Sequence, residues 1–550
     1  MAAFPPVESR PEALAARTRH AVAAAALALL SAWIFARFWS HPEELLNWRF
    51  LTHDLASQLH LSDQLLAGKR LYADVFSQYG PVPASVHLAA AYLFGSTALT
   101  FMVLEGCLAI VCLIQIYILL RRTAPAWWSI VFTAIALLPW VPSTGGGPGA
   151  YLQPYGGMER VVLLAIALAW RPLTGRTVAR NVVLGLLLGL LPWIKFGSAF
   201  VAGAALLGAD VLVLFRRREF RRACWRAILA ANAWVLAGFL GGQSALAIYL
   251  VVTQPPAIAK DVLWPSYMLE NYAGYVTSDI RFVQWQNAGY FIGAQLPVLA
   301  AVLAFFVLIW PAMATTSIER NASSNRAPET FGAFIFLFLF WFIGLAGYLA
   351  HVWLIMGYAW LSMVGAGYAL TFLGPRLRLA ALCLWLPCFF LTAKGVAPGR
   401  APPASNPVIF ENGETLWLDA VWQKRVTLLS DFLAKERTAA VEMPPTIMGI
   451  PTSGGLAHYF RCPVLTRQSW FLPGFVRPYD EEAIRESLAK TAGLVVFSEK
   501  PMELPFPANA NQWGFGPIFS DALATEIPRR FAEPVKLDAF CWALKARQEP

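Results

Sequence analysis

Long apolar segments recur along this chain, and many approach the roughly 20 residues that a helix needs to cross a membrane. The segment "FGAFIFLFLFWFIGLAGYLA" at 331–350, for example, contains no charged residue. Hydrophobic residues make up 57% of the 550 positions, and the mean hydropathy is +0.53. An ordinary soluble domain does not have this composition. The repeated runs therefore predict a polytopic α-helical membrane protein.

We expect about eleven transmembrane helices from these runs, each near the required length. They lie at 21–39, 98–120, 126–141, 159–170, 181–194, 198–215, 227–250, 291–311, 331–350, 352–372 and 377–393. The runs at 159–170 and 181–194 are short enough to be broken or tilted. With a cytoplasmic N-terminus, every basic cluster, such as "RRREFRR" at 216–222, falls on the cytoplasmic side. The C-terminus is then outside, and the net charge of +10 requires no nucleic-acid partner.

The first apolar run also has features of a signal peptide, with a basic start and small residues in "RTRHAVAAAALALLSAWIFA". We favour an uncleaved anchor because no small-x-small cleavage site follows it. In either case the segment at 40–97 lies outside the cytoplasm. This first outer loop is unusually polar for such a chain, with "NWRFLTHDLASQLHLSDQLLAGKRLYADVFSQYGPVPASVH" at 47–87.

The composition changes after the transmembrane domain, which we place at 1–393. A linker rich in proline and small residues follows at 394–405. Residues 406–550 combine a helical pattern, "DEEAIRESLAKTA", with strand-like pieces, "GLVVFSE" and "FCWALKA". This pattern predicts a soluble α/β domain on the extracytoplasmic face.

Cysteines and known motifs constrain the function weakly. Cys462 and Cys541 share the outer domain, where an oxidising compartment leaves a disulfide open. No CxxC, Cys/His metal spacing, Walker loop, GxSxG elbow or dinucleotide fingerprint occurs in the sequence. These observations count against a nucleotide-driven pump and against a hydrolase of the soluble type.

The first outer loop resembles that of the GT-C superfamily of membrane glycosyltransferases. Its wording G-x-x-x-Y-x-D-x-x-x-x-Y-G-P is similar to the branch of protein mannosyltransferases and bacterial lipid A aminoarabinose transferases. The matching positions are Gly68, Tyr72, Asp74, Tyr79, Gly80 and Pro81. "GLLLGLLPWIKFGSAF" and the tail "YFRCPVLTRQSWFLPGFVRPYDEEAIRESLAKTAGLVVFSEKP" resemble the family too. The resemblance covers most of the chain, with each motif loosely matched.

The resemblance implies a transferase that takes a hexosyl or pentosyl unit from a polyprenyl-phosphate carrier. The acceptor would be a lipid, glycan or protein presented outside the cytoplasm. The high alanine, arginine and tryptophan content favours a GC-rich bacterium and hence its inner membrane, with the site facing the periplasm. Such chemistry needs a base near the acceptor hydroxyl and cations near the departing phosphate. No cofactor is implied, and no dense carboxylate cluster supports a divalent metal.

Other functions remain as alternatives. A transporter or flippase of lipid-linked precursors would also be polytopic, but it would normally lack a large outer domain and often has related halves. A polysaccharide polymerase or O-antigen ligase would carry its functional residues in a late outer loop, whereas here the polar residues concentrate in the first. A scaffold that senses envelope glycans is the remaining interpretation.

Asp54 is the candidate catalytic base, because it lies just past the first span, where the resemblance places the first-loop acid. The family often has Asp followed by Glu there, whereas this chain has His53-Asp54-Leu55. That departure leaves the details of acceptor activation and of metal use open. The structural alternative is a cap for a helix that begins at Leu55.

Lys195 is the candidate phosphate ligand, at the outer end of "GLLLGLLPWIK". A lysine at membrane depth is costly unless it is paired or functional. Snorkelling to the interface is the structural alternative. Asp74 could bind acceptor hydroxyls, but we favour a role in fixing the turn before Pro81.

Further residues are candidates for substrate binding. Tyr79 belongs to the first-loop motif. Glu159 is a candidate second acid, and Arg160 either neutralises it or forms a plain surface pair with it. Arg281 and His351 are weaker candidates for contacts with the donor or its phosphate, and an isolated histidine at a helix end is more often structural.

Overall fold

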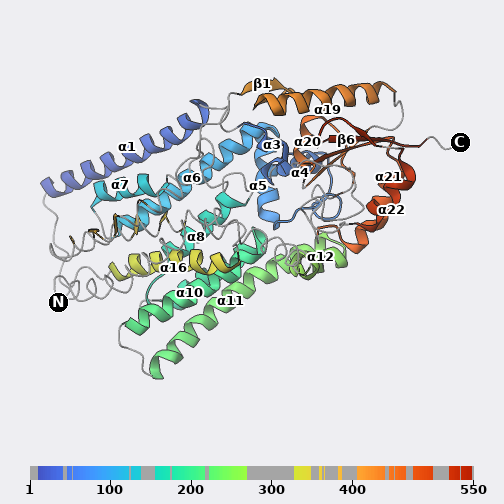
Figure 1. Ribbon diagram of the computed structural model, residues 1–550. Helices are drawn as coiled ribbons and strands as arrows, with labels where there is room; N and C mark the ends of the chain where they lie inside the picture. The colour runs from blue at the N-terminus through green and yellow to red at the C-terminus, as the bar shows by residue number, and fades with distance from the viewer. Residues whose placement is uncertain are drawn as a thin grey trace.

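The computed structural model describes a mainly helical chain with a mixed α/β region at one end (Figure 1). The described residues are 10–40, 46–52, 54–122, 125–137, 155–173, 176–216, 222–268, 270, 327–347, 405–439, 445–450, 452–465, 467, 475–498, 520–532, 534–539 and 541–547, with isolated positions between 358 and 390.

The helical bundle contains each expected span that lies within the described residues. Its helices are α1 (Arg10–Ser40), α6 (Ala98–Arg121), α7 (Ala126–Leu137), α8 (Gly156–Ala169), α9 (Val178–Leu190), α10 (Phe196–Arg216), α11 (Arg222–Thr253) and α16 (Ala327–Gly347). The expected spans at 291–311, 352–372 and 377–393 lie outside the described residues, apart from isolated positions in the last two. Two described stretches, Ala98–Arg121 and Arg226–Thr253, are long and apolar enough to cross a membrane by length and composition.

Helices α8 and α9 are short, as the sequence predicts. They contain 14 and 13 residues, which correspond to about 20 Å of helix against about 30 Å of hydrocarbon. Pro192, inside the 3-10 helix η4 (Leu191–Trp193), follows the end of α9, and α10 starts at Phe196. Lys195 therefore lies in the break between two helices, where backbone leaves the regular helical path.

Glycines on α9 and α11 bring these two helices into backbone contact. A Cβ atom on Gly185 would lie 2.0 Å from the Val235 carbonyl oxygen, and one on Gly238 would lie 2.3 Å from the Val182 oxygen. One turn further along α9, the Gln243 side chain donates a hydrogen bond of 2.8 Å to the Gly189 oxygen. Small residues at four-residue spacing are a known route to such close crossings between membrane helices.

Gly185→Ala is expected to destabilise the bundle by about 1–3 kcal/mol or more, because the added methyl overlaps a carbonyl group that cannot move alone. Gly203→Ala on α10 is the matched control, since its Cβ would meet nothing within 4 Å. The control should be neutral or slightly stabilising, because alanine favours helix over glycine. Thermal unfolding of the purified proteins in detergent measures both. Equal Tm values for the two variants would contradict the close crossing.

The C-terminal region contains a four-stranded mixed sheet in the order β3-β4-β6-β5. Strand β3 (Thr446–Ile450) runs parallel to β4 (Gly493–Ser498), and β4 pairs antiparallel with β6 (Cys541–Lys545), which pairs with β5 (Val535–Lys536). Strands β4 and β6 and helix α21 (Glu481–Ala489) are the elements that the sequence predicts here. The other elements are the hairpin β1 (Asn406–Ile409) and β2 (Thr415–Leu418), and helices α19 (Ala420–Ala439), α20 (Gly454–Tyr459) and α22 (Asp521–Arg530).

Cys462 and Cys541 do not form a disulfide. Both thiols are buried, but they lie in different environments. Cys541 begins strand β6 opposite Phe497, whereas Cys462 follows α20 and lies 3.2 Å from the Arg437 guanidinium. Hydrophobic packing holds the C-terminal region together.

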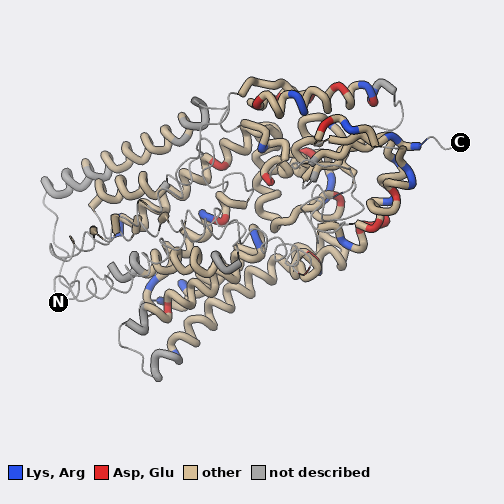
Figure 2. Tube along the Cα trace, viewed as in Figure 1, with Lys and Arg blue, Asp and Glu red and all other residues tan. Residues whose placement is uncertain are grey.

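The first outer loop packs directly on the C-terminal region. It consists of α3 (Arg49–Thr52), α4 (Asp54–Leu66), an irregular stretch at 67–80 and α5 (Pro81–Phe94). A Cβ on Gly455 of α20 would lie 2.3 Å from the Phe50 oxygen, and one on Gly454 would lie 2.5 Å from Ser57 Cα. Figure 2 shows charged residues gathered at this end of the molecule, while the long bundle helices are mostly uncharged. The loop and the C-terminal region thus share one hydrophobic core.

Candidate functional site

Asp54 and Tyr79 meet across the first outer loop. Asp54 is the first residue of α4, and Tyr79 lies next to the last residue of the irregular stretch that precedes α5. The Tyr79 hydroxyl donates a hydrogen bond of 2.6 Å to Asp54 Oδ2. Both side chains are half-buried, so the carboxylate is held by the protein yet open to solvent.

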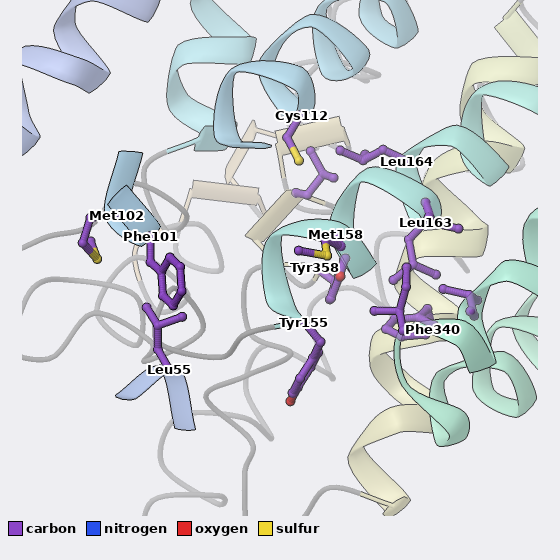
Figure 3. Packing of buried hydrophobic residues seen from close by; sticks show 14 of the residues in the cluster. Leu55, Phe101, Met102, Cys112, Tyr155, Met158, Leu163, Leu164, Phe340 and Tyr358 are labelled. Atoms are coloured by element: carbon purple, nitrogen blue, oxygen red, sulfur yellow. The ribbon is translucent and has the colours of Figure 1, made fainter. Parts of the chain in front are cut away.

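Tyr155 and Lys195 extend this contact into the bundle. The Tyr79 and Tyr155 rings lie 4.7 Å apart between centroids. Lys195 Nζ donates a hydrogen bond of 2.9 Å to the Tyr155 hydroxyl and lies 4.2 Å from the centre of its ring. Figure 3 shows Tyr155 at the start of α8, its ring directed away from Met158 and Leu163. We call the series Asp54, Tyr79, Tyr155 and Lys195 the aspartate–lysine site.

Gly80 is the reason that the two halves of this site can meet. Its amide donates a hydrogen bond of 3.1 Å to the Ile194 oxygen, one residue before Lys195. A Cβ at position 80 would lie 2.1 Å from the Trp193 oxygen, so only glycine allows the loop to pass this close. Tyr79 is thereby placed beside the break that carries Lys195.

Glu159 and Arg160 do not form the surface pair that the sequence analysis considered. Both side chains are buried, and they bind different partners. Ser198 donates a hydrogen bond to Glu159, whereas Arg160 donates one of 2.9 Å to the Gly156 oxygen and lies 3.9 Å from Glu105 on α6. Consecutive residues of a helix do not face each other, which explains the separate partners.

Asp74 is engaged by Arg70. The Arg70 backbone amide donates to Asp74 at 2.8 Å, and two guanidinium nitrogens donate at 3.0 and 3.1 Å. The hydrogen bonds from Arg70 lower the pKa of Asp74. The contacts fit the turn-fixing role that the sequence analysis favoured over acceptor binding.

The structure adds Tyr155 to the candidates and leaves two of them aside. Arg281 and His351 lie outside the described residues. Tyr155 is in the aromatic outer segment "YLQPYGG", which carries no signal for a lysine partner 40 positions away. Within the described parts of the chain, no group of three or more His, Cys, Asp and Glu side chains has the arrangement of a metal site.

His458 joins the C-terminal region to helix α4 of the first loop. Its Nδ1 lies 2.6 Å from Asp63 on α4, and its Nε2 lies 2.5 Å from Glu414. Glu414 also accepts a hydrogen bond of 2.8 Å from the Ala98 amide at the start of α6. Burial lowers the pKa of His458, but the hydrogen bonds and charges of the two carboxylates outweigh burial and raise it to about 9.

The His458 contacts predict a pH-dependent stability of the docked region. Because the folded pKa exceeds the unfolded value, the stabilisation is complete below about pH 6.5 and is lost as the pH rises through about 9. Its size is on the order of 3 kcal/mol. The Tm difference between wild type and His458→Gln should be largest near pH 6 and small near pH 10. A difference that does not change with pH would exclude a charged His458.

His60, the neighbouring histidine on α4, has a pKa lowered by burial to about 4, so it stays neutral over this range.

Comparisons with known proteins give structural neighbours only. No family model matches the chain, and no curated protein matches it. ArnT from Cupriavidus metallidurans bound to undecaprenyl phosphate aligns over 94% of this chain and 97% of that chain, with 14% identity and a TM-score of 0.44. The Archaeoglobus fulgidus oligosaccharyltransferase in complex with Zn and sulfate aligns over 86% of this chain and 68% of that chain, with 13% identity and a TM-score of 0.42.

These two neighbours are an oligosaccharyltransferase and an ArnT solved with a lipid phosphate. Their identities and TM-scores are too low to assign an activity to this chain. Its function therefore has to be inferred from its own residues.

Proposed function

We propose that this chain is a membrane glycosyltransferase that moves a sugar from a polyprenyl-phosphate-linked donor to an acceptor hydroxyl outside the cytoplasm. The observation that carries the proposal is the aspartate–lysine site. A half-buried carboxylate and a half-buried ammonium group stand at the two ends of one series of contacts. The site lies where the apolar helices meet the polar first loop, the level at which a lipid-linked phosphate would be bound.

Each end of the site suits one half of the reaction. The acceptor oxygen attacks the anomeric carbon while the bond from that carbon to the phosphate oxygen breaks, and the electron pair leaves with the phosphate. Asp54 takes the proton of the acceptor hydroxyl. Lys195 stabilises the negative charge that develops on the departing phosphate. Tyr155 holds the lysine in place, and Tyr79 orients the carboxylate.

Neighbouring groups extend this assignment. Glu159 lies one helical turn after Tyr155 on α8 and is a candidate second acid. Asp74 is assigned to the loop structure because Arg70 engages its carboxylate.

The proposed placement in the cell follows from the apolar runs and basic clusters. We propose about eleven transmembrane helices in a bacterial inner membrane, with the N-terminus inside and the first loop and C-terminal region in the periplasm. The donor is a hexosyl or pentosyl polyprenyl phosphate, and the acceptor is an envelope lipid, glycan or protein.

Deletion of the gene, followed by mass spectrometry of envelope lipids and glycans, tests this function. A defined sugar unit should disappear from the envelope and return when the wild-type gene is supplied. The product then identifies both the sugar and the acceptor. Loss of the sugar unit with its lipid-linked precursor retained on the cytoplasmic face would instead favour the transporter, and unchanged envelope sugars would contradict the proposed function.

A further inference from the structure

The irregular stretch at 67–80 is anchored in the C-terminal region through Phe76. This side chain is buried in the hydrophobic cluster around the sheet, with Met448, Leu465, Ile484 and Leu494 among its members. Its ring lies edge-on to Phe475 at 6.2 Å. A first-loop residue is thus part of the core of a region nearly 400 positions later in the chain.

Arg467 forms two hydrogen bonds with the backbone of the stretch at 67–80. The Phe76 amide donates a hydrogen bond of 2.9 Å to the Arg467 oxygen, and the Arg467 guanidinium donates one to the Tyr72 oxygen. The guanidinium is itself held by Asp480, at 2.6 Å, and lies over the Phe76 ring at 5.8 Å. Arg467 therefore ties the loop to the turn that precedes α21.

Tyr72 is the point in the loop where this hold reaches the site. Its φ of 66° lies in the left-handed region, which is unfavourable for a residue with a large side chain. The side chain is buried, and its hydroxyl donates a hydrogen bond of 2.8 Å to the Tyr79 oxygen. The Tyr72 amide closes the turn by donating to the Val75 oxygen at 2.7 Å.

We propose that the C-terminal region sets the geometry of the catalytic carboxylate through this loop, with Arg467 and Tyr72 as positioning residues. The contacts run from Arg467 to the Tyr72 backbone, from the Tyr72 hydroxyl to the Tyr79 backbone, and from the Tyr79 hydroxyl to Asp54. Neither positioning residue contacts Asp54 in these hydrogen bonds. The inference rests on the proposed glycosyltransferase function, and it gives the C-terminal region a role in catalysis.

A double-mutant cycle on the full chain tests the inference, using sugar transfer in membranes to the acceptor that the deletion experiment identifies. Tyr79→Phe removes a hydrogen bond to a charged group and should lower transfer roughly 10- to 100-fold. Tyr72→Phe removes a neutral hydrogen bond and should lower it roughly 2- to 10-fold. If Tyr72 acts through Tyr79, the double variant should be no slower than Tyr79→Phe alone.

Two further variants separate positioning from general damage. Tyr92→Phe makes the same chemical change at a side chain that is 78% exposed on α5, and it should leave transfer unchanged. Arg467→Lys keeps the charge beside Asp480 but lacks the planar fork of the guanidinium. The loss of transfer that it causes in the wild-type background should disappear in the Tyr79→Phe background.

The outcomes distinguish this inference from the proposed function. If the fold losses of transfer in Tyr72→Phe and Tyr79→Phe multiply in the double variant while Asp54→Asn is inactive, only the positioning role would be overturned. Full transfer by both Asp54→Asn and Tyr79→Phe would overturn the proposed assignment of the site itself.

Discussion

Asp54→Asn is expected to lower sugar transfer by roughly 10²- to 10⁴-fold, the range for loss of a general base. Asparagine keeps the shape of aspartate, and its amide oxygen can still accept the hydrogen bond from Tyr79. It cannot take a proton from the acceptor hydroxyl. The measurement is the amount of the lost sugar unit that each version of the gene restores in the deletion strain.

The matched control for this prediction is Asp431→Asn, at an exposed position on α19. It makes the same chemical change far from the site, and transfer should stay at the wild-type level. Thermal unfolding of the purified Asp54→Asn protein shows whether the fold is retained. A folded Asp54→Asn protein that restores the sugar fully would remove Asp54 from the reaction.

Lys195→Gln is expected to lower transfer by about 10²- to 10³-fold, the effect of removing one donor that stabilises developing negative charge. On the proposed function, the variant should also bind a polyprenyl phosphate more weakly, by roughly 10-fold or more, since a charge-assisted hydrogen bond is lost. Purified protein in lipid nanodiscs, titrated with undecaprenyl phosphate and followed by native mass spectrometry, gives the affinity directly.

Two comparisons make the lysine prediction specific. Lys260→Gln, at an exposed position on helix α12 (Pro256–Leu263), removes the same charge outside the site and should bind as wild type does. Asp54→Asn should also retain the lipid phosphate, because its defect lies in proton transfer. Unaltered affinity together with unaltered transfer in Lys195→Gln would show that the lysine is held by Tyr155 for structural reasons only.

Several local features could be predicted from the sequence. The position of Lys195 between two spans followed from the short apolar run at 181–194, and strands β4 and β6 followed from compact apolar segments. Asp54, Tyr79 and Lys195 were each named as candidates from motifs and membrane depth. These signals are local, since hydropathy and periodicity depend on residues within one or two turns of each other.

Other contacts could not be predicted because they join distant parts of the chain. The alternative of a Glu159–Arg160 pair at the surface was wrong, because both side chains are buried and bind other partners. Tyr155 was missed as an individual site residue because its lysine partner comes from a break between helices 40 positions later. The close packing of Gly454 and Gly455 on α4 and α3 has no counterpart in sequence patterns.

By itself the sequence determined that the chain forms many apolar helices, a polar first loop and a terminal α/β region. Those properties follow from the transfer of side chains out of water and from local backbone preference. The tertiary structure alone decided that Tyr79 stands between Asp54 and Tyr155, and that a C-terminal arginine holds its loop. The physical reason is the crossing of Gly80 over the Trp193 carbonyl, a backbone contact between segments more than 100 residues apart.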